Sequence, residues 1–399
     1  MGLNSTPMGE RVHIGFFGRR NAGKSSLVNA FTNQNLSIVS DVKGTTTDPV
    51  YKSMELLPLG PVTIIDTPGL DDEGDLGNLR IKKCMEIVRK VDIALLVIDC
   101  GEGISDEDIK IYTMLEARNI PTIIVMNKSD KYPDFKTFKS DVIKVPAKNI
   151  LYVSAINKVG INELRERVAE CMPEPEKERE LLPPDIGEGS VVVLVIPIDS
   201  SAPKGRLILP QQQVIRALLE KGAASVCTRE TELAETIDKL ASGPDLVITD
   251  SQAFEKVNEV VAGRFPLTSF SILMAKYKGD YEWQLKGAQA IDELQDGDKI
   301  LIAEGCTHHR QCEDIGTVKL PNWLKGYTEK DLVFEFCSGT EFADEDVINN
   351  YKLVIHCGGC MLNEREMKYR VELCKEKGVP VTNYGMAIAK IKGILDIVT

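Results

Sequence analysis

The feature that most constrains the fold of this 399-residue chain is the sequence GRRNAGKS at residues 18–25. Its spacing is G-x-x-x-x-G-K-S, and it lies between an apolar run at residues 13–17 and a helical pattern at residues 27–31. A strand, a glycine-rich loop and a helix in this order form a phosphate loop, whose backbone N–H groups bind phosphate oxygens. The motif predicts an α/β nucleotide site with the contacts Gly18, Asn21, Ala22, Gly23, Lys24, Ser25 and Ser26.

Apolar segments alternate with helical patterns along the rest of the chain, which predicts an α/β fold with sites at the C-terminal ends of the strands. Residues 174–189 are rich in proline, glycine and charge, and this composition is typical of a linker. The segment after it shows no clustered catalytic side chains, so we expect a structural or subunit-interface role for it. The expected order is a nucleotide-binding domain at residues 1–173, a linker at 174–189, and two smaller α/β domains at 190–264 and 265–399.

Further nucleotide motifs follow the phosphate loop in the expected order. The sequence GTTTD at residues 44–48 supplies Thr46, whose hydroxyl can reach Mg²⁺ and the γ-phosphate. Asp66 and Gly69, in DTPG, can complete the Mg²⁺ shell and contact the γ-phosphate through a backbone N–H. Asp130 can accept both N–H donors on the edge of guanine, a pattern that adenine does not offer. The set predicts GTP, with further contacts from Asn127, Lys128, Ser154 and Ala155, and with Lys24, Thr46, Asp66 and Gly69 acting in catalysis.

A second group of chemically distinctive residues lies near the C-terminus. Three of the four histidines fall there, in the sequences CTHH from residue 306 and HCGGC from residue 356. Thiolate and imidazole ligands suit zinc, copper(I) or an iron-sulfur cluster rather than Mg²⁺ or Ca²⁺. From spacing alone, the three cysteines with a histidine favour a Cys₃His zinc site and a [4Fe-4S] cluster about equally. In the second case one iron remains for a weaker ligand, for which the candidates are His308 and His356.

Composition and charge indicate the cellular location of the protein and the kind of partner it binds. The chain holds ten cysteines, and we expect reduced thiols and a cytoplasmic location because neither a signal peptide nor a membrane-spanning apolar run is evident. Residues 1–173 carry 22 Lys and Arg against 23 Asp and Glu, so 11 of the 12 net negative charges belong to the remainder. Nucleic acid requires basic surfaces. A protein partner therefore fits this acidic remainder better than nucleic acid or a membrane does.

On its nucleotide motifs, the part of the chain from about residue 10 to residue 172 resembles the GTPases typified by TrmE and Era. Relatives often carry a glutamine after the D-x-x-G motif to orient water, whereas this chain has Leu70, which cannot do so. In the TrmE-like group an asparagine at the position of Asn21 helps to hold K⁺. The resemblance implies slow hydrolysis of GTP that K⁺ stimulates.

The spacing C-x-H, 47 intervening residues and H-C-x-x-C, joined to such a GTPase domain, resembles the family of [FeFe]-hydrogenase maturation GTPases, HydF. The resemblance covers essentially the whole chain and implies that the middle segment is a dimerisation domain. It also implies a scaffold that accepts a diiron precursor from radical-SAM maturases and transfers it to apo-hydrogenase. The implied cluster ligands are Cys306, Cys357 and Cys360, with His308 or His356 as further candidates, and the implied Mg²⁺ ligands are Ser25, Thr46 and Asp66.

Two other classes of protein remain open at this point. An RNA- or ribosome-associated GTPase with a zinc-binding C-terminal domain would explain the nucleotide motifs equally well, but it would explain the acidic remainder poorly. A metallochaperone that delivers a single metal ion would require a mononuclear site. The ratio of iron to sulfide separates the metallochaperone from the scaffold, whereas the RNA-associated GTPase predicts salt-sensitive RNA binding.

Overall fold

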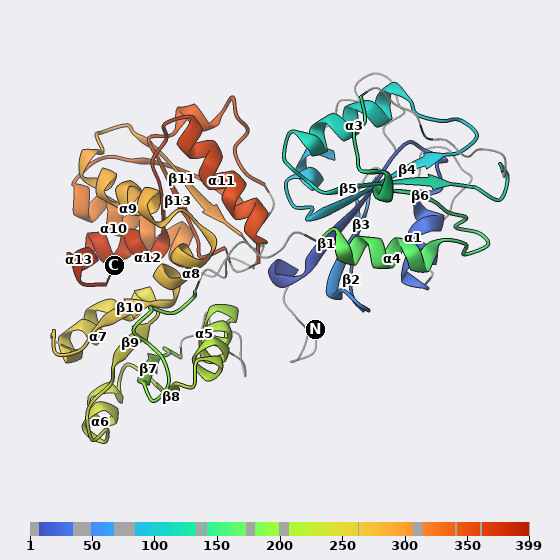
Figure 1. Ribbon diagram of the computed structural model, residues 1–399. Helices are drawn as coiled ribbons and strands as arrows, with labels where there is room; N and C mark the ends of the chain where they lie inside the picture. The colour runs from blue at the N-terminus through green and yellow to red at the C-terminus, as the bar shows by residue number, and fades with distance from the viewer. Residues whose placement is uncertain are drawn as a thin grey trace. The chain divides into compact units, whose positions relative to one another are not determined.

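The computed structural model describes residues 8–34, 49–67, 84–132, 138, 142–172, 180–198, 207–261, 263–305, 314–339, 341–359 and 361–398. The chain divides into two compact units, one within residues 6–176 and one within residues 177–399, and each is described by itself. Both units contain parallel strands alternating with helices (Figure 1). The predicted α/β fold class is therefore confirmed.

The first unit is built on a six-stranded sheet with the strand order β2-β3-β1-β4-β5-β6. Its pairs are parallel except for β2, which runs antiparallel to β3. The strands are β1 (Val12–Phe17), β2 (Val50–Leu56), β3 (Gly60–Asp66), β4 (Ile93–Asp99), β5 (Thr122–Asn127) and β6 (Ile150–Tyr152). The helices are η1 (Met8–Glu10), α1 (Lys24–Thr32), α3 (Asp106–Glu116), η2 (Ala147–Asn149) and α4 (Ile161–Glu170).

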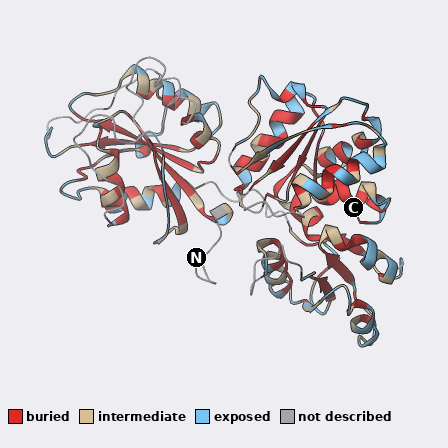
Figure 2. Cartoon of the chain, turned by 180° about the vertical axis from the view of Figure 1, so that it is seen from behind, coloured by how far each residue is buried: buried red, intermediate tan, exposed pale blue. Residues whose placement is uncertain are grey.

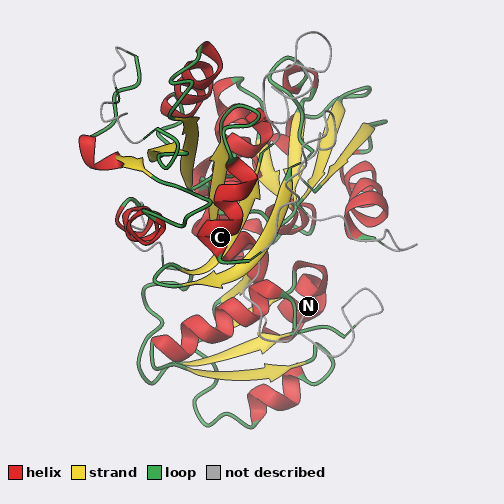
Figure 3. Ribbon diagram, turned by 90° about the vertical axis from the view of Figure 1, so that its right-hand side faces the viewer, coloured by secondary structure: helices red, strands yellow, loops and turns green. Residues whose placement is uncertain are grey.

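The central strand β4 shows why this sheet is covered on both faces. All seven of its residues are buried. Successive side chains of a strand point to opposite faces. Leu95 and Val97 belong to one hydrophobic cluster, and Ala94, Leu96 and Ile98 belong to the other. Two separate cores therefore hold the sheet between two layers of helices, with α3 on one side and α1 and α4 on the other (Figure 1). Figure 3 shows the helices and strands of the chain by colour from another side.

The second unit contains two four-stranded parallel sheets, with the orders β10-β9-β7-β8 and β12-β11-β13-β14. The first sheet has β7 (Val191–Val195), β8 (Ala224–Thr228), β9 (Leu246–Thr249) and β10 (Leu267–Ser269), with α5 (Leu209–Glu220), α6 (Leu233–Asp238), η3 (Ser251–Ala253), α7 (Phe254–Val261) and α8 (Phe270–Lys278). The second sheet has β11 (Lys299–Glu304), β12 (Val333–Ser338), β13 (Leu353–His356) and β14 (Val381–Asn383). Its helices are α9 (Tyr281–Gln289), η4 (Ala290–Glu293), η5 (Ile315–Lys319), α10 (Leu320–Thr328), η6 (Ile348–Asn350), α11 (Glu364–Glu376), α12 (Tyr384–Ile391) and α13 (Leu395–Val398).

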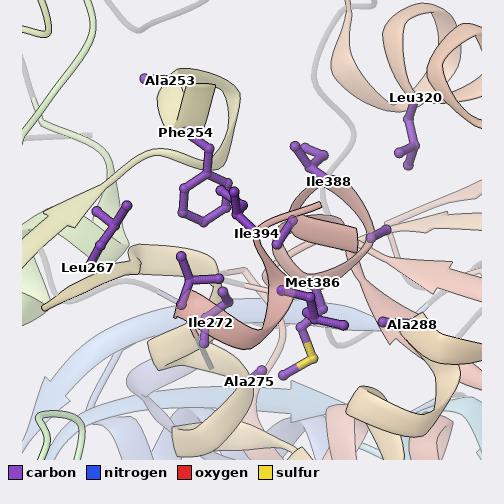
Figure 4. Packing of buried hydrophobic residues seen from close by; sticks show 14 of the residues in the cluster. Ala253, Phe254, Leu267, Ile272, Ala275, Ala288, Leu320, Met386, Ile388 and Ile394 are labelled. Atoms are coloured by element: carbon purple, nitrogen blue, oxygen red, sulfur yellow. The ribbon is translucent and has the colours of Figure 1, made fainter. Parts of the chain in front are cut away.

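One hydrophobic core joins the two sheets of this unit. Figure 4 shows Phe254 and Leu267, from the first sheet's part of the chain, in the same cluster as Met386, Ile388 and Ile394 from the second. Figure 2 shows the central strands of both sheets as buried. The two sheets therefore support each other, because neither has a separate core on the face they share.

Two structural details bear on the predicted boundaries. Leu182 and Ile186, in the segment predicted as linker, are buried in the core of the first sheet. Strand β10 lies beyond residue 264, where we predicted a boundary, yet it pairs with β9 in that same sheet. We therefore propose that the middle module begins before Leu182 and extends through β10. Among the described residues, none of the helices combines the length and hydropathy needed to cross a bilayer.

Candidate functional site

The phosphate loop has the backbone shape that its sequence predicts. Gly18 and Gly23 have φ angles of 133° and 90°, and Asn21 has a φ of 60°. At Gly18 a Cβ atom would lie 2.3 Å from the carbonyl oxygen of Val97, so no larger residue fits there. Lys24 is buried, and its Nζ donates to the carbonyl oxygens of Gly18 and Arg19 at 2.8 and 2.6 Å. These contacts hold the lysine against the loop in position for phosphate oxygens.

Ser25 and Asp66, which are 41 residues apart, lie in direct contact. The Oγ of Ser25, at the start of α1, donates to Oδ2 of Asp66, at the end of β3, over 2.9 Å. A hydroxyl and a carboxylate side by side form the oxygen-rich pair that Mg²⁺ prefers. The chemistry of this pair therefore fits the predicted Mg²⁺ site.

Asn127 connects the two sides of the expected guanine site. Its Nδ2 donates to the carbonyl oxygen of Ala22 at 2.9 Å, and its Oδ1 accepts from the N–H of Ala155 at 3.2 Å. The Nζ of Lys128 forms an ion pair of 2.6 Å with Asp99. The side chain of Asp130 is exposed, so it is accessible to a guanine base. The side chain of Asn127 thus braces the phosphate loop against the loop that carries Ala155.

Arg19 makes contacts that the sequence did not indicate. Its guanidinium donates to the carbonyl oxygen of Gly103 at 2.9 Å and lies 3.3 Å from Glu102 and 3.4 Å from Asp108. Asp108 caps α3 through Ser105, and burial raises the pKa of its carboxyl. Arg19 therefore connects the phosphate loop to the start of α3, although the phosphate-loop motif accepts any residue at its position.

Several predicted residues lie outside the part of the chain that the structure describes. They are the nucleotide-site residues Thr46 and Gly69, and the metal-site residues Cys306, His308 and Cys360. Among the described residues, no group of three or more His, Cys, Asp or Glu side chains forms a metal site.

Cys357, which follows the end of β13, accepts backbone hydrogen bonds from two directions. The N–H of Gly305 donates to its Sγ at 3.0 Å, and the N–H of Gly359 does so at 3.4 Å. A Cβ atom on Gly305 would lie 3.4 Å from the Cα of Gly359, so the two backbones lie close together. Backbone N–H donors favour the anionic form of a thiol, which is the form that binds metals. Gly305 and Gly359 are also the chain neighbours of Cys306 and Cys360.

His356 points away from this thiol. Because adjacent residues at a strand end face opposite sides of a sheet, His356 lies on the side covered by α11. Its Nε2 lies 3.0 Å from Nη1 of Arg370 and its Nδ1 lies 2.8 Å from the carbonyl oxygen of Cys357. Burial lowers the pKa of His356 to about 3, with the charge of Arg370 as a smaller cause. Both ring nitrogens therefore have protein partners, and neither is open to a metal in this arrangement.

The opposite side of the sheet carries Glu304 and Tyr384. The hydroxyl of Tyr384 donates to Oε1 of Glu304 at 3.0 Å. Burial and the nearby Cys357 and Glu304 raise the pKa of Tyr384, so the phenol keeps its proton. A Cβ atom on Gly316 would lie 2.2 Å from this hydroxyl, so the wall of the site is closely packed here.

Comparison with known proteins agrees with this architecture. Residues 13–128 match the family model described as 50S ribosome-binding GTPase. Residues 181–279 match the hydrogen maturase F dimerization domain, and residues 282–398 match the hydrogen maturase F tetramerization domain. The chain thus carries a P-loop GTPase domain followed by two family-specific α/β modules. It belongs to the hydrogen maturase F (HydF) family.

Curated relatives match through a shared part only. GTPase Der of Caldanaerobacter subterraneus is 32% identical over 46% of this chain and 44% of its own length. The tRNA modification GTPase MnmE of Aquifex aeolicus is 32% identical over 40% of this chain and 34% of its own length. The chain thus spans less than half the length of these relatives. A solved structure of Era from Aquifex aeolicus, 19% identical, covers 63% of this chain and 97% of its own with a TM-score of 0.34, too low to support an argument.

Proposed function

We propose that this protein is a GTP-hydrolysing scaffold in the maturation of [FeFe]-hydrogenase. In this role it binds a [4Fe-4S] cluster, accepts a diiron precursor and transfers it to apo-hydrogenase. The observation that carries the proposal is the meeting of Gly305, Cys357 and Gly359 at the end of the C-terminal sheet, in a chain with both family-specific modules.

For GTP, the chain's residues divide the work of binding and charge neutralisation. Lys24 would neutralise the terminal phosphates, while Ser25 and Asp66 would hold Mg²⁺ together with Thr46. In the reaction, water attacks the γ-phosphorus and the bond to the bridging oxygen of GDP breaks. Gly69 would contact the γ-phosphate and Asp130 would select guanine. The short contact between Ser25 and Asp66 supports this assignment.

We expect hydrolysis to be slow and to depend on K⁺, because Leu70 cannot orient water and Asn21 occupies the position that holds K⁺ in the TrmE-like group. Asn21 has an exposed side chain on a loop with a left-handed backbone, and it is accessible to an ion. Replacing Asn21 by Ala should remove the difference between rates in K⁺ and in Na⁺. Equal rates in the two salts for the unaltered protein would refute this expectation.

For the cluster, the proposed ligands are Cys306, Cys357 and Cys360. The residues fit such a group because Cys357 accepts two N–H donors, and the donors adjoin the other two cysteines in the chain. A cluster held by three thiolates offers one iron to an exchangeable ligand. Since His356 has partners on both nitrogens, His308 is the histidine we propose for that position.

The proposed partners are apo-hydrogenase and the radical-SAM maturases, and the proposed assembly contains at least a homodimer. The modules named for dimerization and tetramerization support an oligomer. In this proposal GTP acts as a switch for partner exchange, since a nucleotide changes partner affinity by favouring one conformation over another.

The test is to measure hydrogenase activation and GTP hydrolysis in the same preparation of a Cys306→Ala variant. Activation should be lost while hydrolysis stays within about twofold of the unaltered protein. Full activation by this variant would overturn the scaffold role. Salt-sensitive RNA binding with bound zinc and no sulfide would instead support the RNA-associated GTPase.

A further inference from the structure

Arg370, on α11, is a completely buried cation beside the proposed cluster site. Its exposed fraction is 0%, and it is the largest fully buried side chain among the described residues. The guanidinium donates from Nε to Glu366 at 2.9 Å, from Nη1 to His356 at 3.0 Å and from Nη2 to the carbonyl oxygen of Gly339 at 2.9 Å. The ring of Phe342 covers it, with its centroid 4.9 Å away. Removing a charge from water is costly, so the complete burial of this guanidinium calls for a structural or functional reason.

These contacts connect the two strands that flank β11. Gly339 follows β12 and His356 ends β13, and both strands pair with β11. In register, Ala303 of β11 lies between Cys337 and His356. Because β11 leads directly to Gly305, Arg370 ties together the chain on both sides of the segment that enters the proposed cluster site.

The second link runs through the histidine. An arginine can only donate, so Nε2 of His356 must accept and its proton must be on Nδ1. That N–H then donates to the carbonyl oxygen of Cys357 at 2.8 Å. A continuous path of hydrogen bonds thus runs from Glu366 through Arg370 and His356 to the backbone of Cys357. The path approaches Cys357 from the side of the sheet opposite its thiol.

We propose that Arg370 is a positioning residue for the segment at residues 357–359, which carries the thiol of Cys357. It fixes the tautomer and orientation of His356, and His356 in turn fixes the carbonyl of Cys357, so that the thiol is held toward the N–H groups of Gly305 and Gly359. The inference rests on the proposed function, since it assigns a role toward the cluster. It also makes His356 a residue that supports this segment rather than a metal ligand.

The experiment uses full-length protein reconstituted anaerobically with iron and sulfide. The rate at which a ferrous chelator removes iron is measured, together with the electron paramagnetic resonance spectrum of the reduced sample. The main variant, Glu366→Leu with Arg370→Met, replaces the whole buried ion pair by apolar groups so that no lone charge remains inside. Loss of iron should be about 10- to 100-fold faster, the range seen when groups that support metal ligands are removed. The matched control is Lys368→Met, which removes a positive charge from the outer side of α11, where Lys368 pairs with Glu364.

Two variants of the histidine keep the test decisive if the double variant does not fold. In His356→Gln the side-chain amide oxygen can still accept a hydrogen bond from Arg370, and the amide N–H can still donate to the carbonyl oxygen of Cys357. In His356→Leu both hydrogen bonds are lost. We expect His356→Gln to match the unaltered protein in iron retention and spectrum, and His356→Leu to lose iron at the faster rate. Equal retention in His356→Leu and the unaltered protein, or a changed spectrum in His356→Gln, would overturn the inference. If the unaltered protein itself binds no cluster, the proposed function fails first.

Discussion

Asn127 offers a way to separate residues that organise the GTP site from residues that only contact GTP. In Asn127→Ala, the carbonyl of Ala22 and the N–H of Ala155 both lose their side-chain partner. Asn127 is 2% exposed, so water does not reach these groups easily. A buried donor or acceptor that loses its hydrogen-bond partner costs about 1–3 kcal/mol. For the two groups together we therefore expect the first unit to lose about 2–6 kcal/mol of stability without nucleotide.

For a unit of this size, 1 kcal/mol corresponds to about 2–4 °C in Tm, so the predicted decrease lies between about 4 and 24 °C. The assay is calorimetry of the full chain, following the transition that added GDP raises. GDP affinity should also fall by at least about tenfold, which is about 1.4 kcal/mol. The control is Asp130→Ala, because Asp130 is exposed and should contribute to affinity but not to stability without nucleotide.

The bracing role of Asn127 is refuted if Asn127→Ala unfolds at the same temperature as the unaltered protein when no nucleotide is present. It is also refuted if Asp130→Ala shows the same decrease in Tm, because the brace would then not be specific to Asn127.

Three further predictions concern packing and thiol reactivity. Gly23→Ala should abolish GDP binding in a titration, because Gly23 has a φ of 90° and the new Cβ would lie 2.3 Å from the amide of the bracing asparagine. In Leu182→Ala, the second unit should lose about 2–5 kcal/mol of stability, whereas Leu219→Ala, at an exposed position, should lose little in the same denaturant titration. Maleimide should label the exposed Cys227 well before Cys374, whose burial raises its pKa to about 12, leaving about 10⁻⁴ as thiolate at pH 8; mass spectrometry showing equal labelling would contradict this.

The contacts of the phosphate loop could be anticipated from the sequence because the motif spacing itself encodes the local geometry. The order of strand, glycine-rich loop and helix fixes where the side chains of Lys24 and Ser25 lie. Asp66 is the last residue of a strand that its apolar sequence makes recognisable. The bracing role of Asn127 is different. Its partner Ala22 is 105 residues away, and no local pattern reports such a contact.

The surroundings of the proposed cluster site were harder to predict. Arg370 lies four residues after Glu366, so an ion pair on a helix was foreseeable, but α11 is rich in charge and such a pair is normally exposed. Only the packing of α11 against the strands shows that this ion pair is buried. The orientation of His356 was available in principle, because strand alternation separates it from Cys357. Strand β10 has three residues, which is too short for a periodic pattern to appear.

We propose that Cys306, Cys357 and Cys360 hold a [4Fe-4S] cluster. Metal and acid-labile sulfide analysis of anaerobically purified protein, with electron paramagnetic resonance of the reduced sample, tests it most directly when Cys357→Ser is measured alongside. We predict iron and sulfide in near-equal amounts, a cluster signal that an added ligand alters, and loss of that signal in Cys357→Ser. Zinc without sulfide, together with failure of iron reconstitution, would contradict this assignment of the three cysteines.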